Sequence, residues 1–208
     1  LLIGDLMMDT YTYCESNRIS PEAPVPIAIP KDVINIPGGA GNVAMNLSKL
    51  GAQVTCVGCV GGDHLGLDLI NYLNNNNINT EHIHSIGFNT TNKNRYFSNG
   101  KQLMRLDLEE IHENWQPPNL SNFANNNYDV IILSDYNKGV LNNKWFTNLK
   151  AKNIIVDPKK DDFSFYKNAD IITPNLNELQ RVSNSKIKTQ NDVIDICNKI
   201  INESNLKF

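Results

Sequence analysis

Hydrophobic and polar positions follow two periodicities along the chain. Short apolar runs bounded by turn residues predict buried strands at residues 1–6, 53–60, 130–134, 154–156 and 171–172. Apolar residues at helical spacing predict helices at residues 42–50, 65–73, 142–150, 175–182 and 192–201. Because strands separated by helices pair in parallel, we expect an α/β fold: a parallel sheet with helices on both faces.

Two segments, residues 10–36 and 91–108, interrupt this order with β-type patterns. The first contains an alternating stretch at Tyr11–Cys14, three prolines and a second alternating stretch at Val25–Ile36. The second reads as a hairpin, because Asn99-Gly100 lies between two alternating runs. We predict that the two segments form one small β-sheet that acts as a lid.

Polar residues follow most of the predicted strands. They are Asp5 and Asp9, then Ser134–Gly139, Asp157–Lys159 and Thr173–Asn175. The carboxyl ends of parallel strands meet at one edge of the sheet, where open α/β sheets bind ligands. This edge is therefore the predicted site. A solvated loop carboxylate is an equally good interpretation of Asp5 taken alone.

A glycine-rich stretch, Gly38-Gly39-Ala40-Gly41-Asn42, leads into the first predicted helix. Paired glycines let the backbone approach a ligand, and free N–H groups at a helix start favour polar or anionic groups. The side chain of Asn42 offers a donor and an acceptor, which suits a vicinal diol. A tight strand–helix connection is the alternative interpretation of this stretch.

Composition narrows the class of protein. The 208 residues are 40% hydrophobic and 20% charged with a net charge of −3, which argues against a nucleic-acid partner. No apolar run approaches the roughly 18 residues of a membrane span. The four cysteines suggest buried thiols in a reducing cytoplasm rather than disulfides or a metal site. His82 and His84 alternate on a strand without further candidate metal ligands.

With these residues assembled, the chain resembles the ribokinase-like (PfkB) carbohydrate kinases over its whole length. The matching motifs are Gly4-Asp5 with Asp9, Pro37-Gly38-Gly39 with Asn42, Gly58 with Gly61, Asp63 and Gly66, and Thr173-Pro174-Asn175 with Glu178. Within that family it is most similar to the D-glycero-β-D-manno-heptose 7-phosphate kinase branch. The segments that carry this similarity are Arg18–Pro26, Leu103–Asp107, Ser134–Leu141 and Asp157–Lys159.

The resemblance implies a parallel sheet with a β lid and ATP-dependent phosphorylation of the anomeric hydroxyl of heptose 7-phosphate, on the route to ADP-heptose and the lipopolysaccharide core. By position, Asp9, Gly38, Gly39 and Asn42 would bind the sugar, and Asp135 would face the cleft. Asn175 and Glu178 would belong to the Mg²⁺ and phosphate network. We expect Arg105 in the lid to bind the sugar's phosphate, with Arg95 and Lys93 as the next candidates, and two subunits to pair through the lid.

One departure limits the resemblance. The Gly-Ala-Gly-Asp loop that carries the family's anion hole and catalytic Asp base does not occur in these 208 residues. We therefore interpret the chain as part of a kinase domain, cut at both ends, with the base beyond Phe208 and with little activity of its own. Two alternatives stay open: another PfkB-type sugar or nucleoside kinase, and a non-catalytic sugar-binding or dimerisation protein.

Overall fold

The computed structural model describes residues 1–124, 128–167, 169–204 and 206. Its main sheet contains six strands in the order β10-β9-β8-β1-β4-β5, and every neighbouring pair is parallel. The strands are β1 (Leu2–Gly4), β4 (Val54–Gly61), β5 (Ile78–Ile86), β8 (Tyr128–Ser134), β9 (Ala151–Asp157) and β10 (Ile171–Ile172). This confirms the predicted α/β fold with a parallel sheet.

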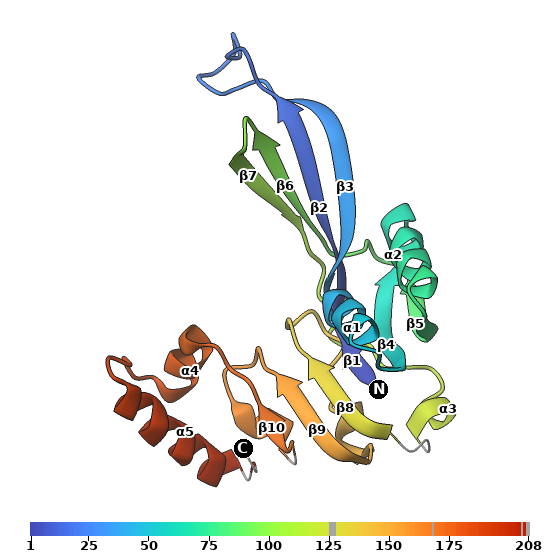
Figure 1. Ribbon diagram of the computed structural model, residues 1–208, viewed down its shortest axis with the longest axis vertical. Coiled ribbons are helices and arrows are strands. Elements are labelled where there is room, and N and C mark those ends of the chain that lie inside the picture. Colours follow the sequence, from blue (N-terminus) through green and yellow to red (C-terminus); the bar gives the residue numbers. More distant parts are fainter. Residues whose placement is uncertain (125–127, 168, 205, 207–208) are drawn as a thin grey trace.

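The two faces of the sheet bury different side chains because successive residues of a strand point in opposite directions. Leu2 packs in a core beneath α1 (Ala40–Lys49) and α2 (His64–Asn75), whereas Ile3 packs in an aromatic-rich core on the other face. That second core includes Phe123 and Trp145. The chain closes with α4 (Leu176–Ser183) and α5 (Gln190–Ser204), which lie beside the β10 edge (Figure 1).

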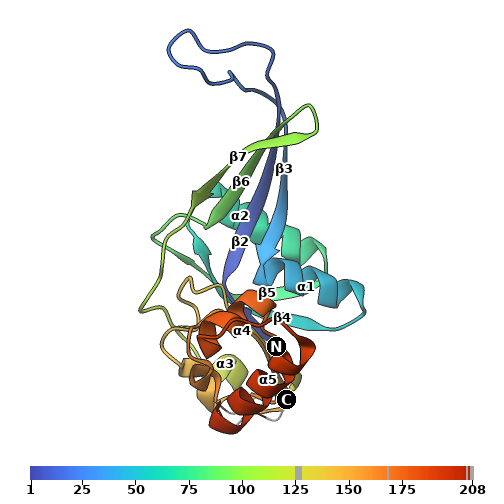
Figure 2. The same ribbon diagram turned by 90° about the vertical axis from the view of Figure 1, so that its left-hand side faces the viewer.

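A second sheet forms the lid, and it projects away from the main sheet (Figures 1 and 2). Its strands are β2 (Leu6–Glu15), β3 (Ile29–Gly39), β6 (Asn92–Ser98) and β7 (Lys101–Leu108), in the order β3-β2-β6-β7. The central pair, β2 and β6, is parallel, so the two predicted β segments do form one sheet. Asn99 and Gly100 both have positive φ at the β6–β7 turn, as the predicted hairpin requires.

The predicted helix at residues 142–150 is wrong. The segment contains a single 3₁₀ turn, η1 (Trp145–Asn148), preceded by Lys144 in the left-handed region. Trp145, Phe146 and Leu149 are all buried, so packing of these side chains sets the backbone path, and the asparagines around them have low helix propensity. A second 3₁₀ turn, η2 (Phe163–Tyr166), and the short α3 (Ser121–Ala124) also lie in this part of the chain.

Other predicted boundaries shift by a few residues. The first predicted strand divides at Asp5, where β1 ends and the lid strand β2 begins. The sequence of residues 205–208 also predicts the start of a strand, but of these residues only Leu206 is among those that the structure describes. Within the described part of the chain, no helix is long and apolar enough to cross a membrane.

Candidate active site

The site lies at the switch point of the main sheet. The chain leaves the central strand β1 to build β4 and β5 on one side and later adds β8, β9 and β10 on the other. Open α/β sheets bind ligands where the strand order reverses in this way. The residue that follows β1 at this point is Asp5.

Asp5 is buried and organises the loop after β8. Its carboxylate accepts hydrogen bonds from the backbone N–H groups of Tyr136 (2.8 Å), Lys138 (3.0 Å) and Val140 (3.1 Å). Its 1% exposure excludes the solvated-carboxylate interpretation. Burial raises the pKa of Asp5, and the three N–H donors oppose that shift. Asp5 therefore holds the loop after β8 against the end of β1.

The glycine-rich stretch connects the lid directly to α1. Gly39 ends β3 with φ +54° and forms the N-cap of α1, where a Cβ would lie 2.5 Å from the carbonyl oxygen of Asp5. Gly38 lies under Asp9, because a Cβ on Gly38 would lie 2.5 Å from Asp9 Oδ2. Asn42, in the first turn of α1, is exposed. The four residues predicted to bind the sugar thus lie near one another, and their role stays a prediction.

The lid face that carries Asp9 is also rich in cations. Arg95 on β6 donates to Asp9 Oδ1 at 2.7 Å, and both side chains are about one-fifth exposed. Lys93 lies over the ring of Tyr136 at 5.6 Å, which places this lid face opposite the loop after β8. Arg105 forms two hydrogen bonds to Asp107 (2.7 and 2.8 Å) and is half exposed, so the Asp107 carboxylate would compete with a phosphate for its donors.

Asp135, predicted to face the cleft, is 3% exposed and has a partner on each carboxylate oxygen. Oδ1 accepts from the N–H of Asn137 (2.6 Å), and Oδ2 accepts from the hydroxyl of Tyr166 (2.6 Å). The structure therefore gives Asp135 a role in fixing loops, and direct contact with a sugar stays a prediction. No pattern in the sequence singles out Tyr166, which belongs to an apolar run.

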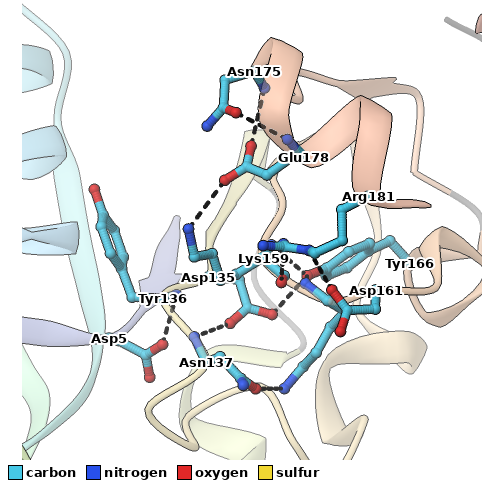
Figure 3. A network of polar contacts seen from close by, with 11 residues as sticks. Asp5, Asp135, Tyr136, Asn137, Lys159, Asp161, Tyr166, Asn175, Glu178 and Arg181 are labelled. Atoms are coloured by element: carbon cyan, nitrogen blue, oxygen red, sulfur yellow. Dashed lines mark hydrogen bonds and ion pairs between the residues drawn. The ribbon is translucent and has the colours of Figure 1, made fainter. Parts of the chain in front are cut away.

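Asn175 and Glu178 form a capping box at the start of α4 (Figure 3). Asn175 Oδ1 accepts from the N–H of Glu178 (3.0 Å), and Glu178 Oε2 accepts from the N–H of Asn175 (2.9 Å). Glu178 Oε1 also accepts from Lys159 Nζ (3.2 Å). Burial and the Glu178 carboxylate raise the pKa of Asp157, and Lys159 opposes that shift. Two carboxylates and one ammonium group therefore lie close together beyond β9.

The remaining candidate ligands of the sequence are structural. Cys56 and Cys59 are buried on β4, and burial raises the pKa of each thiol to about 12, so neither is a ready nucleophile. His82 packs on Phe123 with ring centroids 4.9 Å apart, and His84 lies 6.4 Å from Trp115. Among the described residues, no group of three or more His, Cys, Asp or Glu side chains is arranged for a metal ion.

A parallel sheet with a β lid over its switch point defines the fold as ribokinase-like, and known structures agree. Arabidopsis thaliana ribokinase, solved with ribose and ATP, aligns with a TM-score of 0.76 at 18% identity and covers 99% of this chain and 69% of that chain. The phosphofructokinase-2 of Escherichia coli, solved with fructose-6-phosphate, aligns with a TM-score of 0.75 at 19% identity, covering 100% and 71%. The chain belongs to the pfkB family of carbohydrate kinases, which it matches over residues 1–207.

Similar sequences narrow the comparison. The bifunctional protein HldE of Pasteurella multocida is 37% identical over 213 residues, which cover 99% of this chain and 44% of that protein. HldE of Aliarcobacter butzleri is 39% identical over 207 residues, which cover 94% and 44%. The chain therefore spans less than half the length of these relatives.

Proposed function

We propose that this chain is part of a kinase that transfers the γ-phosphoryl group of ATP to a sugar phosphate, with D-glycero-β-D-manno-heptose 7-phosphate as the substrate. Membership of the pfkB carbohydrate kinases supports the reaction class. Similarity to HldE across the chain, together with the motifs of the heptose branch, supports the sugar. Another sugar or nucleoside of the same family remains the alternative.

The observation that carries the proposal is that one face of the lid combines two groups of side chains. Asp9, over Gly38, provides a carboxylate for sugar hydroxyls, and the same lid face provides Lys93, Arg95 and Arg105 for a phosphate. Arginine binds phosphate through two parallel N–H donors, and each hydrogen bond to a charged group is worth about 1.5–3 kcal/mol. Neutral sugars would not require these cations.

ATP and Mg²⁺ are the cofactors that this reaction requires. Phosphoryl transfer depends on positioning and on neutralising charge on the phosphates, and Mg²⁺ would supply part of that neutralisation. Mg²⁺ binds through one or two carboxylates plus substrate phosphates, and Glu178 and Asp157, near the end of β9, are the carboxylates that would hold it. The chain's own residues here would orient the phosphates, while the base that orients the attacking hydroxyl is not among the residues assigned above.

Arg105 provides the test of substrate class. In the full-length protein that carries this chain, Arg105→Ala should raise KM for heptose 7-phosphate about tenfold or more and leave KM for unphosphorylated heptose nearly unchanged. Lys101→Ala, at the far end of the same strand, is the matched control. Equal losses for the two sugars would leave Arg105 a structural residue of the lid.

We also propose that two copies pair through the lid. Four half-exposed side chains lie on the lid face opposite Asp9, as the strand registers place them: Val33, Met104, Leu106 and Leu108. An apolar sheet face of this kind requires cover, and a second copy presents the same face.

A further inference from the structure

The turn that follows β9, residues 158–161, is fixed more firmly than its surface position requires. Tyr166 lies at its centre, 1% exposed, and its hydroxyl accepts hydrogen bonds from the N–H groups of Lys159 (3.0 Å) and Lys160 (3.2 Å). The same hydroxyl donates to Asp135 Oδ2. Burial and the Asp135 carboxylate raise the pKa of Tyr166, so its hydroxyl remains a donor at neutral pH.

Side chains from three other segments hold the same turn (Figure 3). Arg181 on α4 donates to the carbonyl oxygen of Lys159 (3.0 Å) and pairs with Asp161. Lys160 Nζ donates to the side-chain oxygens of Asn137 and Asn142. The backbone of the turn is therefore tied to the loop after β8, to η2 and to α4.

The side chain of Lys159 is the exception within this fixed turn. Its described partner is Glu178 Oε1, at 3.2 Å, and the ammonium side chain is 42% exposed whereas that of Glu178 is 6% exposed. Because the ammonium group is partly exposed to water, the lysine can leave this pair when another positive charge compensates the buried Glu178 carboxylate. Glu178 keeps the Asn175 N–H when Lys159 leaves.

We propose that this turn presents Lys159 to a phosphate group of a substrate, with Glu178 as its resting counter-ion and with Tyr166 and Asp135 as positioning residues. The inference rests on the proposed kinase function. When a phosphate group binds, the Lys159 ammonium would move to a phosphate oxygen, and the Glu178 carboxylate would then be available to hold a divalent cation that neutralises it. Total charge at the site is then balanced in both states, and only ion pairs are exchanged.

The same contacts would also suit a purely structural ion pair that ties α4 to the sheet. The two interpretations predict different effects on binding when the pair is removed. If the pair is only structural, its loss affects folding and changes the affinity for every ligand to the same extent. If Lys159 binds phosphate, its loss weakens the binding of phosphorylated ligands and leaves the affinity for neutral sugars unchanged.

Lys159→Met separates these interpretations, because methionine keeps the apolar stem and removes the charge. Lys152→Met is the matched control: Lys152 also pairs with a carboxylate, Asp129, at 3.2 Å, but on the open surface beside β8. In the full-length protein, calorimetry with a non-hydrolysable MgATP analogue, heptose 7-phosphate and unphosphorylated heptose gives the three dissociation constants. We expect Lys159→Met to weaken the binding of one of the two phosphorylated ligands tenfold or more and to leave the affinity for heptose unchanged. Lys152→Met should leave all three dissociation constants unchanged.

The ligand whose binding weakens shows whether the phosphate belongs to the nucleotide or to the sugar. Unchanged constants for both phosphorylated ligands, or an equal loss for all three ligands, would overturn the inference. If the wild-type protein binds these ligands but phosphorylates no sugar, the proposed function fails and the role of Lys159 in phosphate binding is still measured.

Tyr166→Phe tests the positioning role. It removes the hydroxyl but keeps the buried ring, and Tyr72→Phe on the exposed face of α2 is the control. We expect a three- to tenfold loss for the same phosphorylated ligand, and little further loss when Tyr166→Phe is added to Lys159→Met, because both act through one ammonium group. A multiplicative loss in the double variant would show that Tyr166 does not act through Lys159.

Discussion

Acidic side chains gather around Tyr136, and their partners divide them into two kinds. Burial raises the pKa of Tyr136, and the nearby carboxylates of Asp157, Asp9, Glu178 and Asp5 raise it further. Asp5 accepts from backbone N–H groups, which cannot leave. Asp9 Oδ1 and Glu178 Oε1 instead accept from the side chains of Arg95 and Lys159. A cationic side chain can leave its carboxylate when a ligand binds, so Asp9 and Glu178 are the carboxylates suited to binding substrates.

At the residue scale, Asp9 and Asn42 provide the first prediction. Asp9→Ala or Asn42→Ala in the full-length protein should reduce kcat/KM for the sugar by the equivalent of about 1.5–3 kcal/mol, the range for hydrogen bonds to charged groups. KM for MgATP should remain nearly constant. Steady-state kinetics at saturating concentrations of the other substrate measures both quantities.

Matched controls exist on the same elements. Asp32 is an exposed carboxylate on β3, the lid strand that pairs with the strand of Asp9. Asn46 is an exposed asparagine one turn after Asn42 on α1. Asp32→Ala and Asn46→Ala should have wild-type kinetics. Wild-type kcat/KM in Asp9→Ala and Asn42→Ala would reduce both residues to scaffolding.

At the element scale, Asp63 joins the start of α2 to the root of the lid. Its carboxylate caps Gly66 N–H (2.9 Å) and accepts from the N–H (2.9 Å) and hydroxyl (2.6 Å) of Thr90, just before β6. Partial burial acts to raise the pKa of Asp63, but the hydrogen bonds from Thr90 and Gly66 prevail and lower it. The folded state therefore favours the ionised carboxylate.

The pH dependence of stability follows from that direction. Because the folded pKa of Asp63 lies below its unfolded value of about 3.9, its stabilisation is complete above pH 4 and is lost as the pH falls through the folded value. Asp63→Asn keeps only one acceptor oxygen and leaves a Thr90 donor without its partner, so it should lower the free energy of unfolding by about 1–3 kcal/mol at pH 7. The difference from wild type should shrink toward pH 3. Urea unfolding at several pH values measures this, with the exposed Asp68→Asn on the same helix as control. A difference that is independent of pH would contradict the role of the charge.

Elements with strong local signals were predictable from sequence. The strand Gln53–Val60 appears as β4, the Asn-Gly hairpin as β6 and β7, and the helix 175–182 as α4 with its cap at Asn175. Elements decided by long-range packing were not. Residues 142–150 have apolar spacing that suits a helix, but burial of Trp145 and Phe146 against the aromatic core prevails.

The same limit applies to the site. Asp9, Gly38 and Glu178 could be proposed from motifs in the sequence, although Asp9 and Gly38 lie within the lid strands β2 and β3 rather than after a strand of the main sheet. Tyr166 could not, because its function as a hydrogen-bond hub depends on turns more than five residues away in the chain and on Asp135, 31 positions earlier. Asp5 was placed correctly at the end of β1, but its three backbone donors become visible only once the loop after β8 is built.

At the scale of the whole molecule, the two proposals for the lid, sugar binding on one face and pairing of two copies on the other, would connect substrate binding to assembly. Its Asp9 face lies opposite the loop after β8, and its other face carries the exposed Val33, Met104, Leu106 and Leu108. A lid of this kind excludes water from the phosphoryl group and, when two copies pair, its movement becomes a property of the dimer.

Leu106→Asp therefore provides a prediction at this scale. A charge in the middle of the apolar lid face should shift the protein from dimer to monomer in sedimentation velocity at micromolar concentration. Leu67 on α2 is also about half exposed, and Leu67→Asp should leave the dimer intact. A wild-type protein that is monomeric at these concentrations would contradict pairing through the lid.

The most direct measurement follows the phosphoryl group itself. Full-length protein is incubated with MgATP and D-glycero-β-D-manno-heptose 7-phosphate, and ³¹P NMR records the products. We expect one ADP to form for each phosphate that appears at the anomeric position. Fructose 6-phosphate and unphosphorylated heptose should react far more slowly. Absence of ADP formation, or a new phosphate on another sugar in preference to the heptose, would contradict the proposed function.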